Sequence, residues 1–249
     1  MTTASPSSSV LGTLHLMPVG LGPAPIGQWL PDAAQTQAGL LSCYIAENAK
    51  TARAFLKLVK LSHPLQEITI HELSPRVDEA QLKRWLEPLR AGQDIGLVSE
   101  AGCPAVADPG ARAVTLAHNW GATVKPWVGP SSILLGLMAS GLDGQRFVFH
   151  GYAPVDQTDR GRQLTVWEQA SSKQSQTQLL IETPYRNQAM FSSLLEHLKG
   201  NTRLCVARSL TTADEWVRTL TITQWKSQPK PELDKHPTLF LFQAPSLKH

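Results

Sequence analysis

Short apolar segments alternate with longer segments of mixed polarity along the first 143 residues. The apolar segments predict five strands, at residues 14–19, 43–46, 67–71, 95–99 and 122–128. Apolar residues between them recur at helical spacing, as at 48–60, where Ala52, Phe55, Leu56 and Val59 share one face. Strands that alternate with helices are typical of an α/β domain with a parallel sheet.

Residues that favour helix ends support these boundaries. Asp78 is a predicted N-cap for a helix that ends near Gly92, and Asp108 is a predicted N-cap with Pro109 as the first helical residue. A further helix is expected from Pro130 to Ser140. Each predicted helix therefore connects two predicted strands.

The pattern changes after the Gly141–Gly144 segment. Strands are predicted at 146–150, 178–182, 203–207, 215–221 and 238–242, with helices at 159–170 and 184–198. Few residues separate 203–207 from 215–221, so these strands are expected to pair antiparallel within a mixed sheet. We therefore predict a flexible leader (1–12), an N-terminal α/β domain with a parallel sheet (13–143) and a C-terminal α/β domain with a mixed sheet (144–249).

Composition supports a folded protein of two domains. The chain has 249 residues, and its content of 42% hydrophobic and 17% charged residues excludes a disordered chain. Residues 1–143 carry 10 Lys and Arg against 11 Asp and Glu, whereas residues 144–249 carry 13 against 9. An anionic partner is therefore expected to meet the C-terminal half.

Several classes of protein are excluded by missing signals. The three cysteines (Cys43, Cys103, Cys205) are widely spaced, which argues against a disulfide framework and a zinc site. The first nine residues lack the features of a secretory signal, and the longest apolar stretch, 133–142, is too short to cross a bilayer. We expect a cytoplasmic protein that binds no metal and no membrane.

Three loops rich in Gly, Pro or Ser follow predicted strands, at 18–27, 99–104 and 129–132. Ligands of open α/β sheets bind beyond the carboxyl ends of the strands, and the helix start at Ser131 and Ser132 suits a carboxylate or phosphate. These loops predict one small-ligand cleft. The dinucleotide-binding fingerprint, the phosphate-binding GxxxxGK[ST] loop and the G-x-S-x-G elbow are all absent.

The segment SEAGCPAVADPG at 99–110 resembles the S-D-A-G-T-P-x-x-S-D-P-G block of the tetrapyrrole methylase superfamily. It is most similar to the branch of small-subunit rRNA cytidine 2′-O-methyltransferases. The family's other blocks follow in the same order, at 46–53 (AENAKTAR), 129–132 (GPSS), 139–142 (ASGL), 146–154 (RFVFHGYAP), 182–186 (ETPYR) and 206–208 (VAR). The chain resembles a short form, which lacks the C-terminal module of the longer rRNA members.

The resemblance implies two α/β domains, with S-adenosylmethionine in the cleft between them, and a homodimer. Carried over by position, the cofactor-binding residues would be Pro18, Gly102, Pro104, Ser131, Ser132, Thr183 and Ala207. In the first loop, Pro18 and Pro23 are alternatives for one family position. The ligand requires backbone polar groups and an apolar wall, and no metal.

Departures from the family pattern concentrate on the acceptor side. Glu100 stands where the family has Asp, Cys103 where it has Thr, and Asn48 where it has Asp. Candidate acceptor contacts are Asn48, Tyr185 and Arg186. Asn48 could equally be an N-cap, and Arg186 could equally form an ordinary ion pair.

Three side chains are candidate catalytic groups, namely Glu100, Glu47 and His150. A general base must lie within hydrogen-bond reach of the acceptor and have a suitable pKa. The structural alternatives are a turn-stabilising carboxylate for Glu100, an N-cap for Glu47 and a packed histidine for His150.

Some further side chains are candidates for binding RNA. Arg160, Arg162, Arg186 and the basic stretch 226–235 could contact its phosphates, and Trp29 could stack on the acceptor.

The function predicted from these residues and this resemblance is methyl transfer from S-adenosylmethionine to an rRNA ribose 2′-hydroxyl. One alternative is methylation of a small-molecule or tetrapyrrole acceptor. Another is a non-catalytic member of the same fold that binds the cofactor or RNA without turnover.

Overall fold

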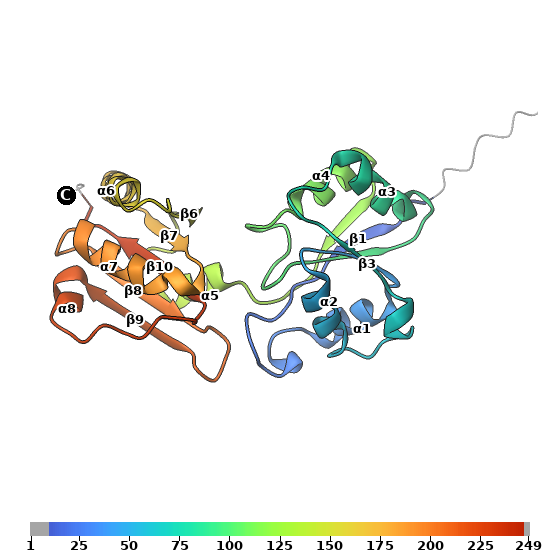
Figure 1. Ribbon diagram of the computed structural model, residues 1–249, viewed down its shortest axis with the longest axis horizontal. Helices are drawn as coiled ribbons and strands as arrows, with labels where there is room; N and C mark the ends of the chain where they lie inside the picture. The colour runs from blue at the N-terminus through green and yellow to red at the C-terminus, as the bar shows by residue number, and fades with distance from the viewer. Residues whose placement is uncertain (1–9, 247–249) are drawn as a thin grey trace, which may run out of the picture. The chain divides into compact units, whose positions relative to one another are not determined.

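The computed structural model describes residues 10–246 in two compact units, which divide after Pro130 (Figure 1). Residues 1–9 of the predicted leader lie outside the described residues. Residues 10–12 are not a free leader, because the Gly12 N–H donates to the Leu89 carbonyl at 2.7 Å and Leu11 packs against the core.

The first unit contains a five-stranded sheet in the order β3-β2-β4-β1-β5, and every neighbouring pair is parallel. Its strands are β1 (Thr13–Leu16), β2 (Cys43–Ala46), β3 (Thr69–Glu72), β4 (Ile95–Val98) and β5 (Thr123–Pro126). Because all five strands point the same way, the loops that follow them leave from one edge of the sheet.

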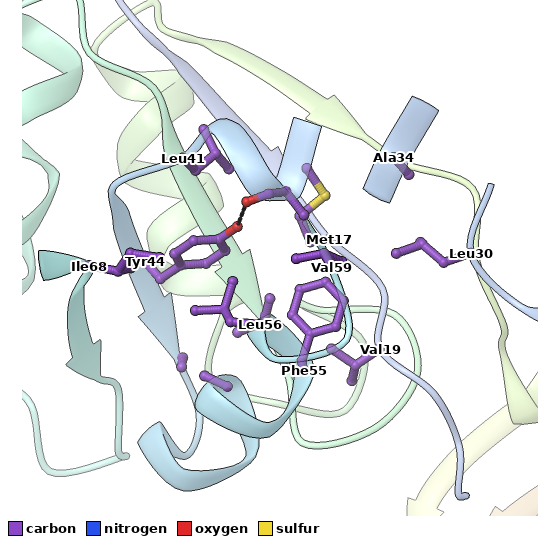
Figure 2. Packing of buried hydrophobic residues seen from close by; sticks show 14 of the residues in the cluster. Met17, Val19, Leu30, Ala34, Leu41, Tyr44, Phe55, Leu56, Val59 and Ile68 are labelled. Atoms are coloured by element: carbon purple, nitrogen blue, oxygen red, sulfur yellow. Dashed lines mark hydrogen bonds between the residues drawn. The ribbon is translucent and has the colours of Figure 1, made fainter. Parts of the chain in front are cut away.

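Helices cover both faces of this sheet (Figure 1). α1 (Asp32–Leu40) and α2 (Ala49–Leu56) pack on one face, and α3 (Glu79–Arg90) and α4 (Ala111–Asn119) pack on the other. In Figure 2 the side chains of Phe55 and Leu56 lie with Tyr44 and Met17 in the core beside α1 and α2. The buried Tyr44 hydroxyl donates to the Ala38 carbonyl at 2.5 Å, so β2 is also tied to α1 through a polar contact.

The second unit contains a five-stranded mixed sheet in the order β6-β7-β10-β8-β9. Its strands are β6 (Phe147–Tyr152), β7 (Thr177–Ile181), β8 (Arg203–Arg208), β9 (Trp216–Thr221) and β10 (Thr238–Gln243). β6 and β7 are parallel, and the other neighbouring pairs are antiparallel. The pairing of β6 with β7 shifts register between Phe149 and Tyr152, where Gly151 has a φ of +67°.

The core of this unit lies under α6 (Gln157–Gln174), α7 (Asn187–His197) and α8 (Ile222–Lys226). Phe240 and Phe242 of β10 belong to that core. α5 (Ser132–Ser140) packs on residues of the opposite face, since a methyl group at Gly136 would lie 2.4 Å from Leu239 Cδ2 and 3.6 Å from Leu241 Cδ1. Successive side chains of β10 point to opposite faces of the sheet, so Phe240 and Phe242 pack in the core under α6, α7 and α8, whereas Leu239 and Leu241 face α5.

The fold class predicted from the sequence is confirmed, with a parallel sheet followed by a mixed sheet. The junction differs, because the units divide after Pro130 and not at Gly144. The reason is the packing of α5 on β10, which assigns residues 131–143 to the second unit. Two helices, α1 and α8, were not predicted.

Candidate functional site

Loops that follow β1 and β4 meet at the carboxyl edge of the first sheet. The Val19 N–H donates to the Gly102 carbonyl at 3.0 Å, and the Gly102 N–H donates to the Val19 carbonyl at 3.1 Å. The Ser99 hydroxyl also donates to the Gly102 carbonyl, at 3.3 Å. Two of the three predicted ligand loops are therefore held together by backbone hydrogen bonds.

Gly102 is required by the backbone at this junction. Its φ is +74°, and a methyl group there would lie 3.3 Å from Leu21 Cδ2 and 3.5 Å from the Pro130 carbonyl oxygen. Such a φ is strained for any residue with a Cβ. Glycine is therefore the residue that this position accommodates best. Because glycine has no side chain, the backbone of residue 102 is not covered by one.

The third loop, after β5, joins the same cluster. The Cys103 thiol donates to the Pro130 carbonyl at 3.5 Å, and a methyl group at Gly129 would overlap the ring of Pro18. Pro18 and Pro104 are buried, whereas Pro23 is exposed. Of the two prolines that could hold the family position, Pro18 is the one packed within this cluster. We name the cluster formed by residues 18–22, 99–104 and 129–130 the loop junction.

Asp108 stabilises the turn beyond the loop junction and does not cap a helix. Its carboxylate accepts the Ala105 N–H at 2.9 Å and the Gly110 N–H at 2.6 Å. The helix α4 begins at Ala111 with Gly110 as its N-cap, so the predicted N-cap at Asp108 and the helical Pro109 are wrong. Burial raises the pKa of Asp108, and the two backbone donors oppose that shift.

Two candidate catalytic carboxylates lie next to each other at the same edge. Oε2 of Glu47, after β2, accepts the Glu100 N–H, after β4, at 3.0 Å. Burial raises the pKa of Glu47, the hydrogen bond from Glu100 lowers it, and the negative charges of Asp108 and Glu100 raise it again. Glu47 is half-buried and Glu100 is exposed, so Glu47 has the more perturbed environment.

Asn48 takes the capping role that is the alternative to acceptor binding. Its side-chain oxygen accepts the Lys50 N–H at 2.9 Å and the Thr51 N–H at 3.3 Å, at the start of α2. These contacts occupy the oxygen and leave the amide nitrogen for other partners.

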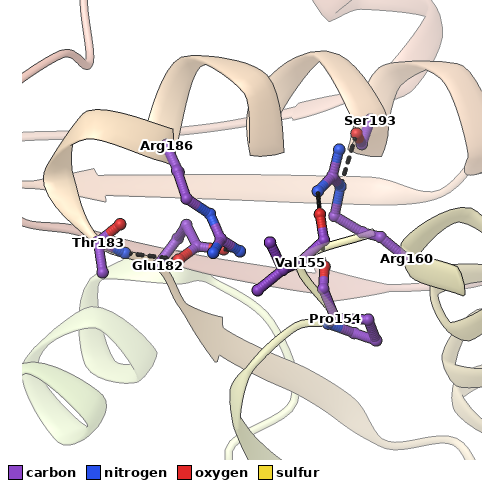
Figure 3. Close-up of polar contacts among 7 residues, drawn as sticks. All are labelled: Pro154, Val155, Arg160, Glu182, Thr183, Arg186 and Ser193. Atoms are coloured by element: carbon purple, nitrogen blue, oxygen red, sulfur yellow. Dashed lines mark hydrogen bonds and ion pairs between the residues drawn. The ribbon is translucent and has the colours of Figure 1, made fainter. Parts of the chain in front are cut away.

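In the second unit, Thr183, Tyr185 and Arg186 follow β7 on a 3₁₀ turn, η3 (Pro184–Arg186). The Arg186 guanidinium donates to the carboxylate of Glu182, which in turn accepts the Thr183 N–H at 2.8 Å (Figure 3). The Glu182 side chain is only 1% exposed, whereas Tyr185 is 81% exposed. The ion pair expected as the structural alternative for Arg186 is thus present, beside an unpacked tyrosine.

Ala207, Ser131 and Ser132 also belong to the second unit. Ala207 is buried in β8 and pairs with Leu239 and Val217 in the neighbouring strands. Ser131 is the N-cap of α5, where its hydroxyl accepts the Leu134 N–H at 3.5 Å. The predicted helix start at Ser131 and Ser132 is confirmed, although Pro130 lies outside the helix.

His150 lies within β6 and is half-buried by residues of its own unit. Its Nε2 lies 2.7 Å from Oε1 of Gln178, and its ring stacks on Trp167 with centroids 4.0 Å apart. Burial lowers the pKa of His150, so the neutral ring is favoured at pH 7. These contacts match a packed histidine, the structural alternative to a catalytic base.

Two other sequence expectations are corrected by packing. Trp29 is buried and tilted against Phe55 at 6.3 Å, so its ring is not available for stacking on an acceptor. Arg160 is 8% exposed and donates to Ser193 Oγ at 3.0 Å and to the Val155 carbonyl at 2.9 Å (Figure 3). It fixes the start of α6 and does not present its charge to RNA.

Buried polar atoms near the ends of β7 and β8 were not predicted. Asn187 Oδ1, Arg208 Nε and Thr211 Oγ1 have no hydrogen-bond partner within the described residues. Ser209 and Thr211 have φ values of +51° and +69°. Buried polar groups without partners are rare in folded proteins, and Asn187 is itself fully buried. The signal in the sequence was weak, because Asn187 lies one residue beyond the matched block 182–186.

Two negative findings concern residues 10–246. No helix in this range is both long and apolar enough to cross a membrane. In the same range, no three His, Cys, Asp or Glu side chains gather closely enough to hold a metal ion.

Comparison with known proteins identifies the family. A family model for tetrapyrrole (corrin/porphyrin) methylases matches residues 36–225. Two proteins named ribosomal RNA small subunit methyltransferase I are similar over most of both chains. The one from Synechocystis is 30% identical over 84% of this chain and 72% of its own, and the one from Bacillus subtilis is 29% identical over 84% and 68%.

Solved structures show the same fold at lower identity. The methyltransferase CobJ aligns with a TM-score of 0.61 at 15% identity, covering 94% of each chain. The cobalt precorrin-4 methyltransferase CbiF aligns with a TM-score of 0.59 at 14% identity, covering 93% of this chain and 94% of its own. From the family match and the fold together, the chain belongs to the tetrapyrrole methylase family and is an S-adenosylmethionine-dependent methyltransferase.

Proposed function

We propose that this protein methylates a ribose 2′-hydroxyl of small-subunit ribosomal RNA, in the cytoplasm and as a homodimer. The observation that carries the choice of acceptor is the similarity to proteins named for that rRNA, at about 30% identity over more than four-fifths of this chain. The solved methyltransferases CobJ and CbiF share only 15% and 14% identity with this chain. The alternatives, a tetrapyrrole acceptor or binding without turnover, become outcomes of the test.

The residues present fit S-adenosylmethionine in chemical type. In the first unit, the loop junction offers the backbone of Gly102, which has no side chain of its own, with Pro18 and Pro104 as apolar neighbours. In the second unit, Ser131, Ser132, Thr183 and Ala207 are the proposed contacts.

The bound cofactor would supply an electrophilic methyl group on a sulfonium centre. The protein's part is to hold a ribose hydroxyl in line with it and to accept the proton of that hydroxyl. We assign the proton acceptor to Glu47, because burial raises its pKa and its second oxygen has no hydrogen bond to another described residue. The Glu100 N–H then fixes the orientation of the Glu47 carboxylate, so Glu100 is a positioning residue through its backbone.

Acceptor binding is assigned to Asn48, Tyr185 and Arg186. The exposed ring of Tyr185 can stack on a nucleobase, as aromatic side chains do in single-stranded RNA recognition. Arg186 can bind a phosphate through the guanidinium nitrogens that do not face Glu182. The amide nitrogen of Asn48 completes the set.

The test is methyl transfer with the purified full-length chain and labelled S-adenosylmethionine. Small ribosomal subunits from cells that lack this protein should gain label, and nuclease digestion should release a 2′-O-methylated nucleoside. Label in a tetrapyrrole but not in RNA would favour the small-molecule alternative. Cofactor binding by calorimetry without label in any acceptor would favour the non-catalytic alternative.

A further inference from the structure

A pocket of about 630 Å³ opens in the second unit where the chain enters β6 and β7. It is lined by residues that precede or begin these strands, namely Gln145, Arg146, Phe147, Lys173, Gln174 and Gln176. The proposed methyl-transfer site includes none of them.

The pocket lies at the opposite end of the strands from the candidate acceptor residues. β6 and β7 run parallel, so their amino-terminal ends share one edge, while Tyr152, Thr183 and Tyr185 follow at the carboxyl edge. The five steps from Phe147 to Tyr152 span roughly 17 Å at the usual rise of a strand. A ligand in this pocket would therefore bind away from Thr183 and Tyr185, which belong to the second unit's part of the proposed methyl-transfer site.

The charged side chains that line the pocket are all positive. Arg146 and Lys173 are exposed cations, and no carboxylate lines the pocket. The neighbouring Asp143 is engaged with the backbone, since its Oδ1 accepts the Gln145 N–H at 2.7 Å and the Arg146 N–H at 3.4 Å. The Arg146 guanidinium also donates to the Gln174 carbonyl at 3.5 Å, which holds it at the pocket wall.

The remaining groups suit a nucleobase. Phe147 is 40% exposed although it is a large apolar side chain, and it lines the pocket together with the two cations. Three glutamines add amide donors and acceptors that can reach the polar edges of a base. Cations for the backbone and an aromatic ring for a base form the usual combination in single-strand binding.

We propose that this pocket binds a segment of single-stranded RNA, as a docking site distinct from the methyl-transfer site. The choice of RNA over other polyanions rests on the proposed function. The positive charge of the pocket and its exposed aromatic ring are observed independently of that function. The excess of positive charge in residues 144–249 also favours binding of a polyanion such as RNA.

The experiment measures binding of a fluorescent oligouridylate to the full-length protein by anisotropy, without cofactor. Arg146→Glu with Lys173→Glu should lower the affinity at least tenfold. It should also reduce the slope of log affinity against log salt by about 1.4, because each phosphate contact to a single strand contributes about 0.7. The matched control, Lys57→Glu with Lys83→Glu in the first unit, makes the same change of charge and should bind like the unaltered protein.

A second variant separates base stacking from charge. Phe147→Leu keeps an apolar side chain in β6 but removes the ring, and it should lower the affinity about tenfold. The same variant should leave binding of heparin, a polyanion without bases, unchanged. Equal losses for both ligands, or no loss for RNA, would overturn the proposal.

Methyl transfer distinguishes this inference from the proposed function. The charge variant should raise KM for the small ribosomal subunit and leave kcat unchanged, because the pocket binds RNA away from the reacting atoms. If the unaltered protein methylates rRNA while the variant keeps its KM, the docking site is wrong and the proposed function stands. If the unaltered protein binds oligouridylate and loses that binding in the variant, yet methylates no RNA, the docking site stands and the proposed function is wrong.

Discussion

At the scale of single residues, the loop junction depends on one backbone conformation. Gly102 has a φ of +74° and near neighbours, whereas Gly121, in the turn before β5, has a φ of +75° and open space where a methyl group would stand. The two glycines share their backbone strain and differ in their surroundings. They form a natural pair for separating strain from ligand binding.

Gly102→Ala is expected to weaken binding of S-adenosylmethionine at least tenfold, whereas Gly121→Ala is expected to leave it unchanged. Both variants should lose about 1–2 kcal/mol of stability, because alanine is strained at a positive φ. Calorimetry measures the affinity and urea denaturation the stability. Unchanged affinity in Gly102→Ala would show that the cofactor does not contact this loop.

Glu47→Gln is expected to lower kcat about 100-fold, the lower range for removal of a general base. In the unaltered protein, activity should fall as the pH drops through the raised pKa of Glu47, because the protonated carboxyl cannot accept a proton. Glu100→Gln is the control, since it keeps the backbone N–H that orients Glu47. If kcat falls further in Glu100→Gln than in Glu47→Gln, Glu100 is the general base and Glu47 is not.

The same variant has an opposite effect on stability. A carboxyl group whose pKa is raised by folding destabilises the folded state once it ionises. Glu47→Gln should therefore melt at a higher temperature than the unaltered protein near pH 7. The difference should disappear as the pH falls below the pKa of Glu47 in the unfolded chain, where both proteins are neutral at this position. A lower melting temperature at pH 7 would contradict the assigned environment.

At the scale of elements, the strands could be predicted from the sequence but two helices could not. α1 buries only small residues, Ala34, Ala38 and Gly39, so its contact face has no large apolar side chains to reveal a helical period. α8 is short, yet its capping box of Thr221 and Gln224 is visible in the sequence as T-x-x-Q. The first helix thus lacks a signal, whereas the second has one that its five-residue length makes easy to miss.

Close packing of α5 on the second sheet gives a prediction at this scale. Gly136→Ala places a methyl group 2.4 Å from Leu239 Cδ2, and Leu239 is itself buried. The variant should lose about 1–3 kcal/mol by overpacking, although alanine favours a helix. Gly144→Ala, with no atom within 4 Å, should stay within about 0.5 kcal/mol of the unaltered protein by urea denaturation, the usual range for a surface substitution. Equal stability of both variants would mean that α5 is free to move away from β10.

At the scale of the whole molecule, each unit has its own hydrophobic core. Leu86 belongs to the core of the first unit and Leu194 to that of the second, and both are fully buried. Much of this division could be read from the changing pattern of strands. Its position could not, because α5 packs on Leu239, which is far along the chain from Gly136. The contact between Glu47 and Glu100 in the candidate site could not be predicted for the same reason, because the two residues are 53 positions apart in the sequence.

Two leucine variants test whether the units unfold separately. Leu86→Ala should cost about 2–5 kcal/mol in the first unit and accelerate hydrogen exchange of core amides in residues 10–130. Leu194→Ala should do the same for residues 131–246. Acceleration in both units by either variant would show that they unfold as one cooperative body.

The shifted register in β6 has a consequence for self-association. β6 is an edge strand that carries aromatic residues at both ends, Phe147 and Tyr152, and such an edge is a template for pairing with another chain. The irregularity near Gly151 interrupts the even row of backbone donors and acceptors that a second strand would need. The fold thus exposes aromatic rings at this edge while its backbone discourages the growth of fibres.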